Sequence, residues 1–245
     1  MIFARSLAFC SFMALLCLLV FGEWYWIIIS LVYYKLVVGL IGNQVAQHRY
    51  FSHNSFVTTR WKKFFLYFIS LTTGVSPRDY AIIHRHHHKY SDEPGDVHSH
   101  SNKFTDIFFP LVGTTSATTD IRIGRVLDQD LKGFYKYHSM TITGTILIVS
   151  LLSWKVAIYL LLSGVAWNYT HMILFRVFLV HKKLPGSYRN FETSDNSWNN
   201  KWIQLLDLGE GLHNNHHHKP TAYNQAMLPG EFDPAGWIVR KFFAL

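Results

Sequence analysis

The chain contains 15 histidines, and most of them fall into three short groups. Imidazole is the commonest neutral nitrogen ligand of iron, zinc and copper in proteins. Histidines repeated at short spacing in separate segments therefore predict that distant parts of the chain meet at one shared metal centre. The groups are His48 with His53; His84 with His86, His87 and His88; and His213 with His216, His217 and His218.

Helical geometry separates the expected ligands from their sequence neighbours. Residues at positions i, i+3 and i+4 lie on one face of an α-helix. The second and third groups both contain His-x-x-His-His at this spacing, whereas His86 and His218 would point away. The ligands expected from these two groups are His84, His87, His88, His213, His216 and His217.

The first group has a different spacing. His48 and His53 are five residues apart, and at about 100° per residue they cannot share one face of a regular α-helix. We therefore expect the helix that carries them to end or loosen between the two. With these residues the ligand set reaches eight, more than the four or so that one zinc site takes, so we expect two metal ions.

Four apolar segments predict a protein embedded in a membrane. A helical span needs about 20 mostly apolar residues, and the segments form two pairs that read as helical hairpins. They cover about residues 7–21, 24–41, 141–153 and 156–174, and two shorter apolar segments, 61–75 and 104–112, are expected to lie along the membrane surface. The predicted fold is an all-α integral membrane protein of one domain, residues 1–245, in which segments 42–140 and 175–245 form a histidine-rich cytoplasmic cap.

The distribution of charge predicts the orientation in the membrane. The net charge of +8 could indicate a nucleic-acid partner, but membrane proteins also collect Lys and Arg on their cytoplasmic loops. Here the basic residues gather between the hairpins and after the last span, whereas only Lys155 sits at a hairpin tip. We therefore expect no nucleic-acid binding, and we expect both termini and the metal site on the cytoplasmic side.

Three features near the N-terminus have competing interpretations. Arg5 before an apolar segment could mark a signal peptide, but no small-residue cleavage site follows, which favours a retained membrane anchor. Lys35 inside the second span is either a lysine that reaches for the interface or a functional charge. Cys10 and Cys17 would share one helix face, so we expect neither a disulfide nor a thiolate metal site.

The three histidine groups, with their flanking residues, resemble the histidine boxes of membrane fatty-acyl desaturases. Gly209-Glu210-Gly211 before the third group and Pro220 after it are most similar to the delta-9, stearoyl-CoA desaturase-like branch. The resemblance implies two iron ions and a ninth histidine at the cytoplasmic end of the fourth span, a position that His171 matches. His98, His100, His138 and His181 have no partner at ligand spacing and are not expected to be ligands.

Polar residues beside the boxes are candidates for contacts with the metal-bound histidines. Carboxylates commonly hold such histidines from outside the metal's own ligand sphere. Asp92, Asp96, Asp195 and Glu210 lie close to the boxes in sequence. The resemblance also implies an asparagine four residues before the ninth histidine; that place is Trp167 here, which leaves Asn168, one step later, as the candidate.

The resemblance implies an oxygen-dependent enzyme that removes two hydrogens from a saturated acyl chain and leaves a cis double bond. The substrate would be an acyl chain on coenzyme A, a carrier protein or a membrane lipid, with O2 as co-substrate. Electrons would come from a separate donor such as cytochrome b5 or a ferredoxin, and the basic middle loop is a candidate docking surface for it. A related di-iron hydroxylase or ketolase is the main alternative, and a metal transporter or buffer a remote one.

Overall fold

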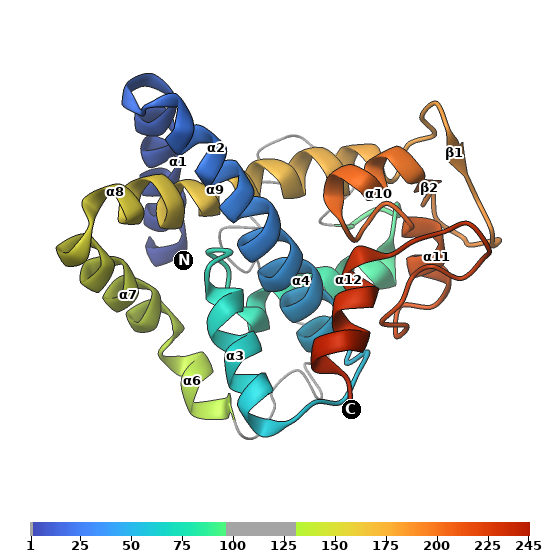
Figure 1. Cartoon of the computed structure of the whole chain (residues 1–245). Helices are drawn as coiled ribbons and strands as arrows, with labels where there is room; N and C mark the ends of the chain where they lie inside the picture. The colour runs from blue at the N-terminus through green and yellow to red at the C-terminus, as the bar shows by residue number, and fades with distance from the viewer. Residues whose placement is uncertain (1, 97–130) are drawn as a thin grey trace.

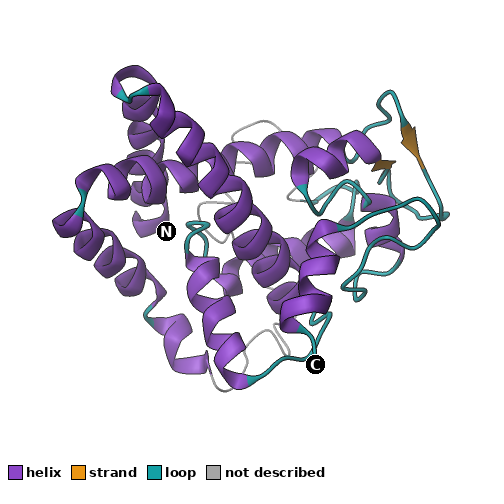
Figure 2. Ribbon diagram, in the orientation of Figure 1, coloured by secondary structure: helices purple, strands orange, loops and turns teal. Residues whose placement is uncertain are grey.

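The computed structural model describes residues 2–96 and 131–245, which are mostly helical (Figures 1 and 2). The α-helices are α1 (Ile2–Phe21), α2 (Trp24–Tyr33), α3 (Arg60–Leu71), α4 (Pro77–Tyr90), α6 (Lys132–Lys136), α7 (His138–Leu152), α8 (Trp154–Val156), α9 (Ser163–His171), α10 (Lys201–Asp207), α11 (His213–His218) and α12 (Pro234–Ile238). Segments with wider, π-type hydrogen bonding are η1 (Tyr34–Ser52), η5 (Ala157–Leu162), η6 (Met172–Leu179) and η7 (Val239–Phe243). Strands β1 (Ser187–Tyr188) and β2 (Asn199–Asn200) pair antiparallel.

Three of the described helices are long and apolar enough to cross a membrane: Ile2–Phe21, Trp24–Ser52 and Trp154–Leu174. They correspond to the first, second and fourth expected spans. Helix α7, which contains the expected third span, is apolar but has only 15 residues, fewer than the roughly 20 that a span needs. The fourth crossing therefore stays a prediction.

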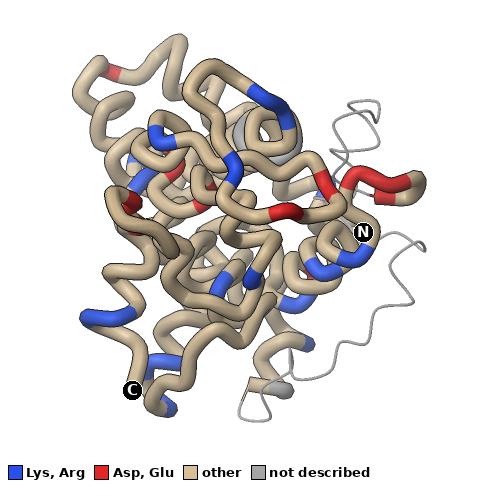
Figure 3. The backbone as a smooth tube through the Cα atoms, turned by 90° about the vertical axis from the view of Figure 1, so that its right-hand side faces the viewer, with Lys and Arg blue, Asp and Glu red and all other residues tan. Residues whose placement is uncertain are grey.

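The tips of the two helical hairpins meet at one end of the molecule. Lys155 Nζ, beside the α7–α8 turn, donates to Glu23 Oε1 in the α1–α2 turn at 2.7 Å. Both turns lie on the left of Figure 1, whereas α10 and α11 lie on the right, and Figure 3 shows Lys and Arg on many segments of that right-hand end. Helix α1 packs along α9 and η5, which holds the two hairpins together.

The second span is longer than expected and changes its geometry along its length. Helix α2 continues without a break into η1, so the helix ends at Ser52 rather than near residue 41. In η1 the hydrogen bonds join residues five apart, as His53 N does to His48 O at 3.2 Å. Because this wider winding brings residues five apart to nearly the same face, His48 and His53 point to one place. The expectation that the helix ends or loosens between them is met, since it widens and then ends at Ser52.

Of the two apolar segments expected along the membrane surface, one can be described. Helix α3 falls within residues 60–71 and exposes Trp61, Phe65 and Phe68, while Leu66 and Tyr67 are buried against the core. An exposed aromatic face of this kind suits a helix lying along a bilayer. The other segment, 104–112, lies outside the described residues.

A buried arginine joins the second span to the C-terminal segment. Arg49 is 1% exposed and makes two hydrogen bonds to the Asp233 carboxylate, at 2.9 and 3.1 Å. It also donates to the carbonyl oxygens of Gln44, Gly209 and Tyr223. One side chain therefore satisfies acceptors from η1, from the segment before α11 and from the segment before α12.

Replacing Arg49 by methionine is expected to destabilise the fold strongly. The change keeps the apolar stem but leaves the Asp233 carboxylate buried without its cation, which typically costs about 3–5 kcal/mol. Thermal unfolding of the detergent-solubilised protein measures the loss. Arg60→Met, at an exposed position on α3, is the control and should change the melting temperature little. Equal melting temperatures for the two variants would contradict this role of Arg49.

Candidate metal centre

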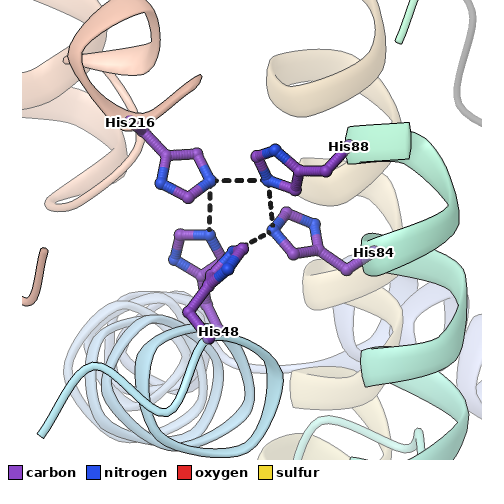
Figure 4. Close-up of side chains that lie close together, drawn as sticks. His48, His84, His88 and His216 are labelled. Carbon is purple, nitrogen blue, oxygen red and sulfur yellow. Dashed lines mark hydrogen bonds between the residues drawn. The ribbon is translucent and has the colours of Figure 1, made fainter. Parts of the chain in front are cut away.

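Five histidines from three segments converge on one point. One ring nitrogen of each lies within 4.8 Å of the corresponding nitrogens of the others. Figure 4 shows His48, His84, His88 and His216 around this point; the Nε2 atoms of His48 and His216 are 3.1 Å apart, and those of His88 and His216 are 2.8 Å apart. The five-histidine group is His48 and His53 from the end of η1, His84 and His88 from α4, and His216 from α11.

Four further histidines form a second group beside the first. The Nε2 atom of His213 lies 3.0 Å from that of His181 and 3.0 Å from that of His217. The rings of His88 and His217, one from each group, have centroids 4.5 Å apart, so the groups are neighbours. The four-histidine group is His87 from α4, His181 from the segment after η6, and His213 and His217 from α11.

Carboxylates contact the outward-facing Nδ1 atoms of histidines in both groups. Three of these contacts join one carboxylate to one histidine of the four-histidine group. They are Asp96 with His87 at 3.0 Å, Asp92 with His181 at 2.9 Å and Asp195 with His217 at 2.8 Å. A carboxylate accepts a hydrogen bond from Nδ1–H, which places the proton on Nδ1 and leaves the lone pair of Nε2 facing the interior of the group.

Glu210 connects the two groups. Its Oε1 lies 2.9 Å from Nδ1 of His48, and its Oε2 lies 3.1 Å from Nδ1 of His213. The side chain of Glu210 is 1% exposed. A single carboxylate therefore contacts one histidine of each group: it is hydrogen-bonded to His213 and lies at ion-pair distance from His48.

The glycines on either side of Glu210 are required by close packing. A Cβ on Gly211 would lie 2.0 Å from the backbone N of Gln204, and one on Gly209 would lie 2.6 Å from Cδ of Gln44. Neither place has room for a side chain. The Gly-Glu-Gly sequence thus allows the chain before α11 to press against α10 and η1 while Glu210 reaches both groups.

Burial favours the uncharged form of six of these histidines. Burial away from water is the largest cause of the lowered pKa in each case, and the neighbouring histidines lower it further. Burial lowers the pKa of His181 to about 4. The pKa is lowered well below its usual range for His53, His84, His88, His216 and His217. Burial by itself would raise the pKa values of Asp92 and Asp195, but their hydrogen bonds to His181 and His217, backbone N–H donors and the electrostatic effect of the nearby histidines together outweigh it and lower both pKa values.

Neutral imidazoles with their lone pairs facing one another fit a metal cation. In the four-histidine group each histidine has a carboxylate at Nδ1, so the inward nitrogens have no proton to share and would repel each other at 3.0 Å. Metal–nitrogen bonds of about 2.1 Å at right angles place neighbouring nitrogens about 3 Å apart. The observed separations match this geometry, so both groups can hold a metal ion.

The structure corrects the expectation for the ninth histidine. His171 lies in neither group; its Nε2 contacts the Asp207 carboxylate instead. His181, which was not expected to be a ligand, occupies the ninth place. The reason is the length of the fourth helix, which continues through η6 to Leu179 instead of ending near residue 174, so the histidine at its end is His181.

Asn168 also lies away from both groups. Its Nδ2 donates to the Thr73 carbonyl oxygen at 3.1 Å, within a buried polar layer that includes Asn43 and Gln47. Asn168 is therefore not placed for the expected role beside the metal.

The remaining histidines lie outside both groups or outside the described residues. His86 packs against Tyr90, with ring centroids 4.8 Å apart, and His218 stacks on Phe191 at 3.9 Å. His138 Nδ1 contacts the Tyr135 carbonyl oxygen at 3.1 Å. His98 and His100 lie outside the described residues.

Comparisons with known proteins agree with this site. The fatty acid desaturase family model matches residues 24–228, which include both histidine groups. The chain is 30% identical to delta-9 acyl-lipid desaturase 1 of Arabidopsis thaliana over 95% of this chain and 78% of that protein. It is 27% identical to the sn-1 stearoyl-lipid 9-desaturase of Anabaena variabilis, over 74% of this chain and 67% of that protein, and 27% identical to the icosanoyl-CoA 5-desaturase of Limnanthes douglasii, over 89% and 62%. The chain thus belongs to the membrane fatty acid desaturase family and is an oxidoreductase that acts on fatty acyl chains.

Proposed function

We propose that this chain is a di-iron desaturase that uses O2 and two electrons to introduce a cis double bond at the delta-9 position of a saturated acyl chain. The observation that carries the proposal is the pair of adjacent histidine groups. Within each group the inward-facing nitrogens are as far apart as nitrogens that bind one metal ion would be. The names of the Arabidopsis and Anabaena relatives support the delta-9 position.

The charges around the two groups favour two divalent ions. Glu210, Asp92, Asp96 and Asp195 place four carboxylates against the histidines, and all four are buried or partly buried. Buried carboxylates need compensating positive charge, which neutral imidazoles do not provide. Two divalent cations would balance four carboxylates. Histidine ligands without cysteine suit iron that must also bind oxygen, and bound iron would supply the O2 chemistry that attacks an unactivated methylene pair.

The protein itself positions the reactants. The carboxylates hold the histidines of the four-histidine group in one tautomer and one orientation, so that ligand set is assembled before a metal binds. An apolar cavity of about 180 Å³ lies between α3, α7, η5 and α9; Leu71, Ile146 and Val165 are among its lining residues. We propose it as a place for part of the acyl tail.

We further propose that the histidine groups face the cytoplasm and that a separate donor delivers the electrons there. The hairpin tips meet at the opposite end of the molecule, and Lys155 is the one basic residue among the two turns. The positive-inside tendency therefore puts the histidine end on the cytoplasmic side. A soluble or membrane-anchored electron carrier such as cytochrome b5 or a ferredoxin could reach the site from that side.

Fatty-acid profiling of cells that express the chain tests the function. A host that lacks its own desaturase should gain monounsaturated acyl chains with a cis bond at carbon 9, located by mass spectrometry of derivatised chains. The His87→Ala variant should give none, because His87 belongs to the four-histidine group. Hydroxylated or keto products without new double bonds would instead support a related oxygenase and refute the desaturase.

A further inference from the structure

The carboxyl-terminal end of α10 is held by residues from two membrane spans. Lys35 Nζ, from the second span, donates to the Leu206 carbonyl oxygen. His171 Nε2, from the fourth span, contacts Asp207 Oδ1. A cation at the C-terminal end of a helix is favoured by the helix dipole, and a lysine inside a span is stabilised when it finds such an acceptor. Both contacts come immediately before the Gly-Glu-Gly segment.

Asp207 connects the end of α10 to Glu210 through a hydrogen bond. While Oδ1 contacts His171, Oδ2 accepts from the Glu210 backbone N–H at 2.8 Å and from Gln44 Nε2 at 3.0 Å. Asp207 and His171 are 5% and 8% exposed, so water does not compete strongly for these bonds. The backbone of Glu210 is thereby tied to a side chain that is itself tied to the fourth span.

Any shift of Glu210 would reach both histidine groups. Its two carboxylate oxygens contact His48 and His213, which belong to different groups. The adjoining segment has little freedom of its own, because Gly211 packs directly against Gln204 and Leu208 adopts a left-handed conformation with φ of 65°. A contact made by His171 on the fourth span is thus connected to both groups through two side chains.

We propose that His171 and Asp207 are a positioning pair that fixes Glu210 and, through it, both metal sites. The inference rests on the proposed di-iron function. It gives His171 a role that is distinct from metal ligation: the residue acts on two sites at once and touches neither. It also assigns the intramembrane Lys35 to the same junction, as the anchor of α10 to the second span.

Iron content of purified variants, measured at one fixed free Fe(II) concentration, tests the proposal. His171→Leu and Asp207→Leu should each weaken iron binding at both sites by about tenfold, the lower range for loss of a contact that orients ligands. The double variant should be no worse than either single variant, because both break the same link. Asp207→Asn keeps an oxygen that can accept from Glu210 N–H, so it should retain most of the iron.

Asp195→Leu is the reference for damage to one site. Among the nine histidines of the two groups, Asp195 is hydrogen-bonded to His217, so this variant should lose iron from the four-histidine group alone. If His171→Leu behaved in the same way, losing one iron while keeping the other, His171 would be acting as a ligand and the proposal would be wrong. Full retention of both ions would also overturn it. A wild-type protein that binds no iron would refute the proposed function instead.

A second measurement covers the case in which the leucine variants do not fold. His171→Met removes the side-chain nitrogen that contacts Asp207 but keeps a side chain of similar length, so it changes the packing less than leucine does. Mössbauer spectra of this variant loaded with ⁵⁷Fe should show altered signals from both irons, because Glu210 touches both histidine groups. A spectrum identical to that of the wild type, or a change in one iron only, would contradict the positioning role.

Discussion

Replacing His216 by alanine is expected to abolish desaturation and to remove iron from the five-histidine group. His216 is 0% exposed, and its Nε2 lies within 3.1 Å of the Nε2 atoms of both His48 and His88. Alanine would remove a ligand from the centre of the group and leave a buried gap beside the remaining nitrogens. Product formation in expressing cells and iron content of the purified protein measure the two effects.

His218→Ala is the matched control for this prediction. It lies two residues away on the same short helix, but its ring stacks on Phe191 outside both groups. We expect normal iron content and near-normal activity from it, with at most a small loss of stability. Substantial activity in His216→Ala, or loss of iron in His218→Ala, would show that α11 presents a different face to the metals.

Replacing Glu210 by glutamine is expected to impair both metal sites at once. The amide keeps the shape, but its NH2 group would face a histidine Nδ1–H, so one of the two contacts becomes donor against donor. Loss of a carboxylate that orients a metal-bound histidine typically costs 10–100-fold in affinity or activity. Because Glu210 serves two histidines, we expect activity to fall by about 100-fold and both irons to bind more weakly.

Asp195→Asn provides the comparison for Glu210. It also replaces a buried carboxylate by its amide, but next to one histidine of one group. We expect weaker iron binding at the four-histidine group only, with the five-histidine group unchanged. Equal iron profiles for Glu210→Gln and Asp195→Asn would mean that Glu210 does not link the sites.

The sequence could predict the histidine groups on α4 and α11 because the α-helix period is regular. His84, His87 and His88 recur at i, i+3 and i+4, and the structure places all three in the two groups. The same period predicts that His86 points away from this face, and in the structure its ring packs against Tyr90. The four carboxylates near the boxes could also be named as candidates, because they are close to the histidines along the chain.

Two details of helix winding could not be predicted, because apolar composition does not report them. The spacing of His48 and His53 predicts that the helix ends or loosens between them, but not that the π-type winding of η1 brings both to one point. The fourth helix extends through η6, so His181 and not His171 lies in the four-histidine group. The one sequence signal for His181 was its location just beyond an apolar helix, and the end of that helix was placed several residues too early.

Contacts between residues that are far apart in the sequence could not be predicted either. His171 and Asp207 are 36 residues apart, and Glu210 and His48 are 162 apart, so no local pattern joins them. Their contacts arise only when α10 packs against the spans. This packing explains why a histidine that looked like a ligand in the sequence lies at a structural junction.

Iron analysis combined with ⁵⁷Fe Mössbauer spectroscopy of the purified wild-type chain tests the central claim most directly. The nine histidines of the five-histidine and four-histidine groups should bind two irons per chain. The spectra should contain two signals of equal area, since the groups have different numbers of nitrogen ligands. A protein that desaturates acyl chains while binding one iron or none would contradict the account.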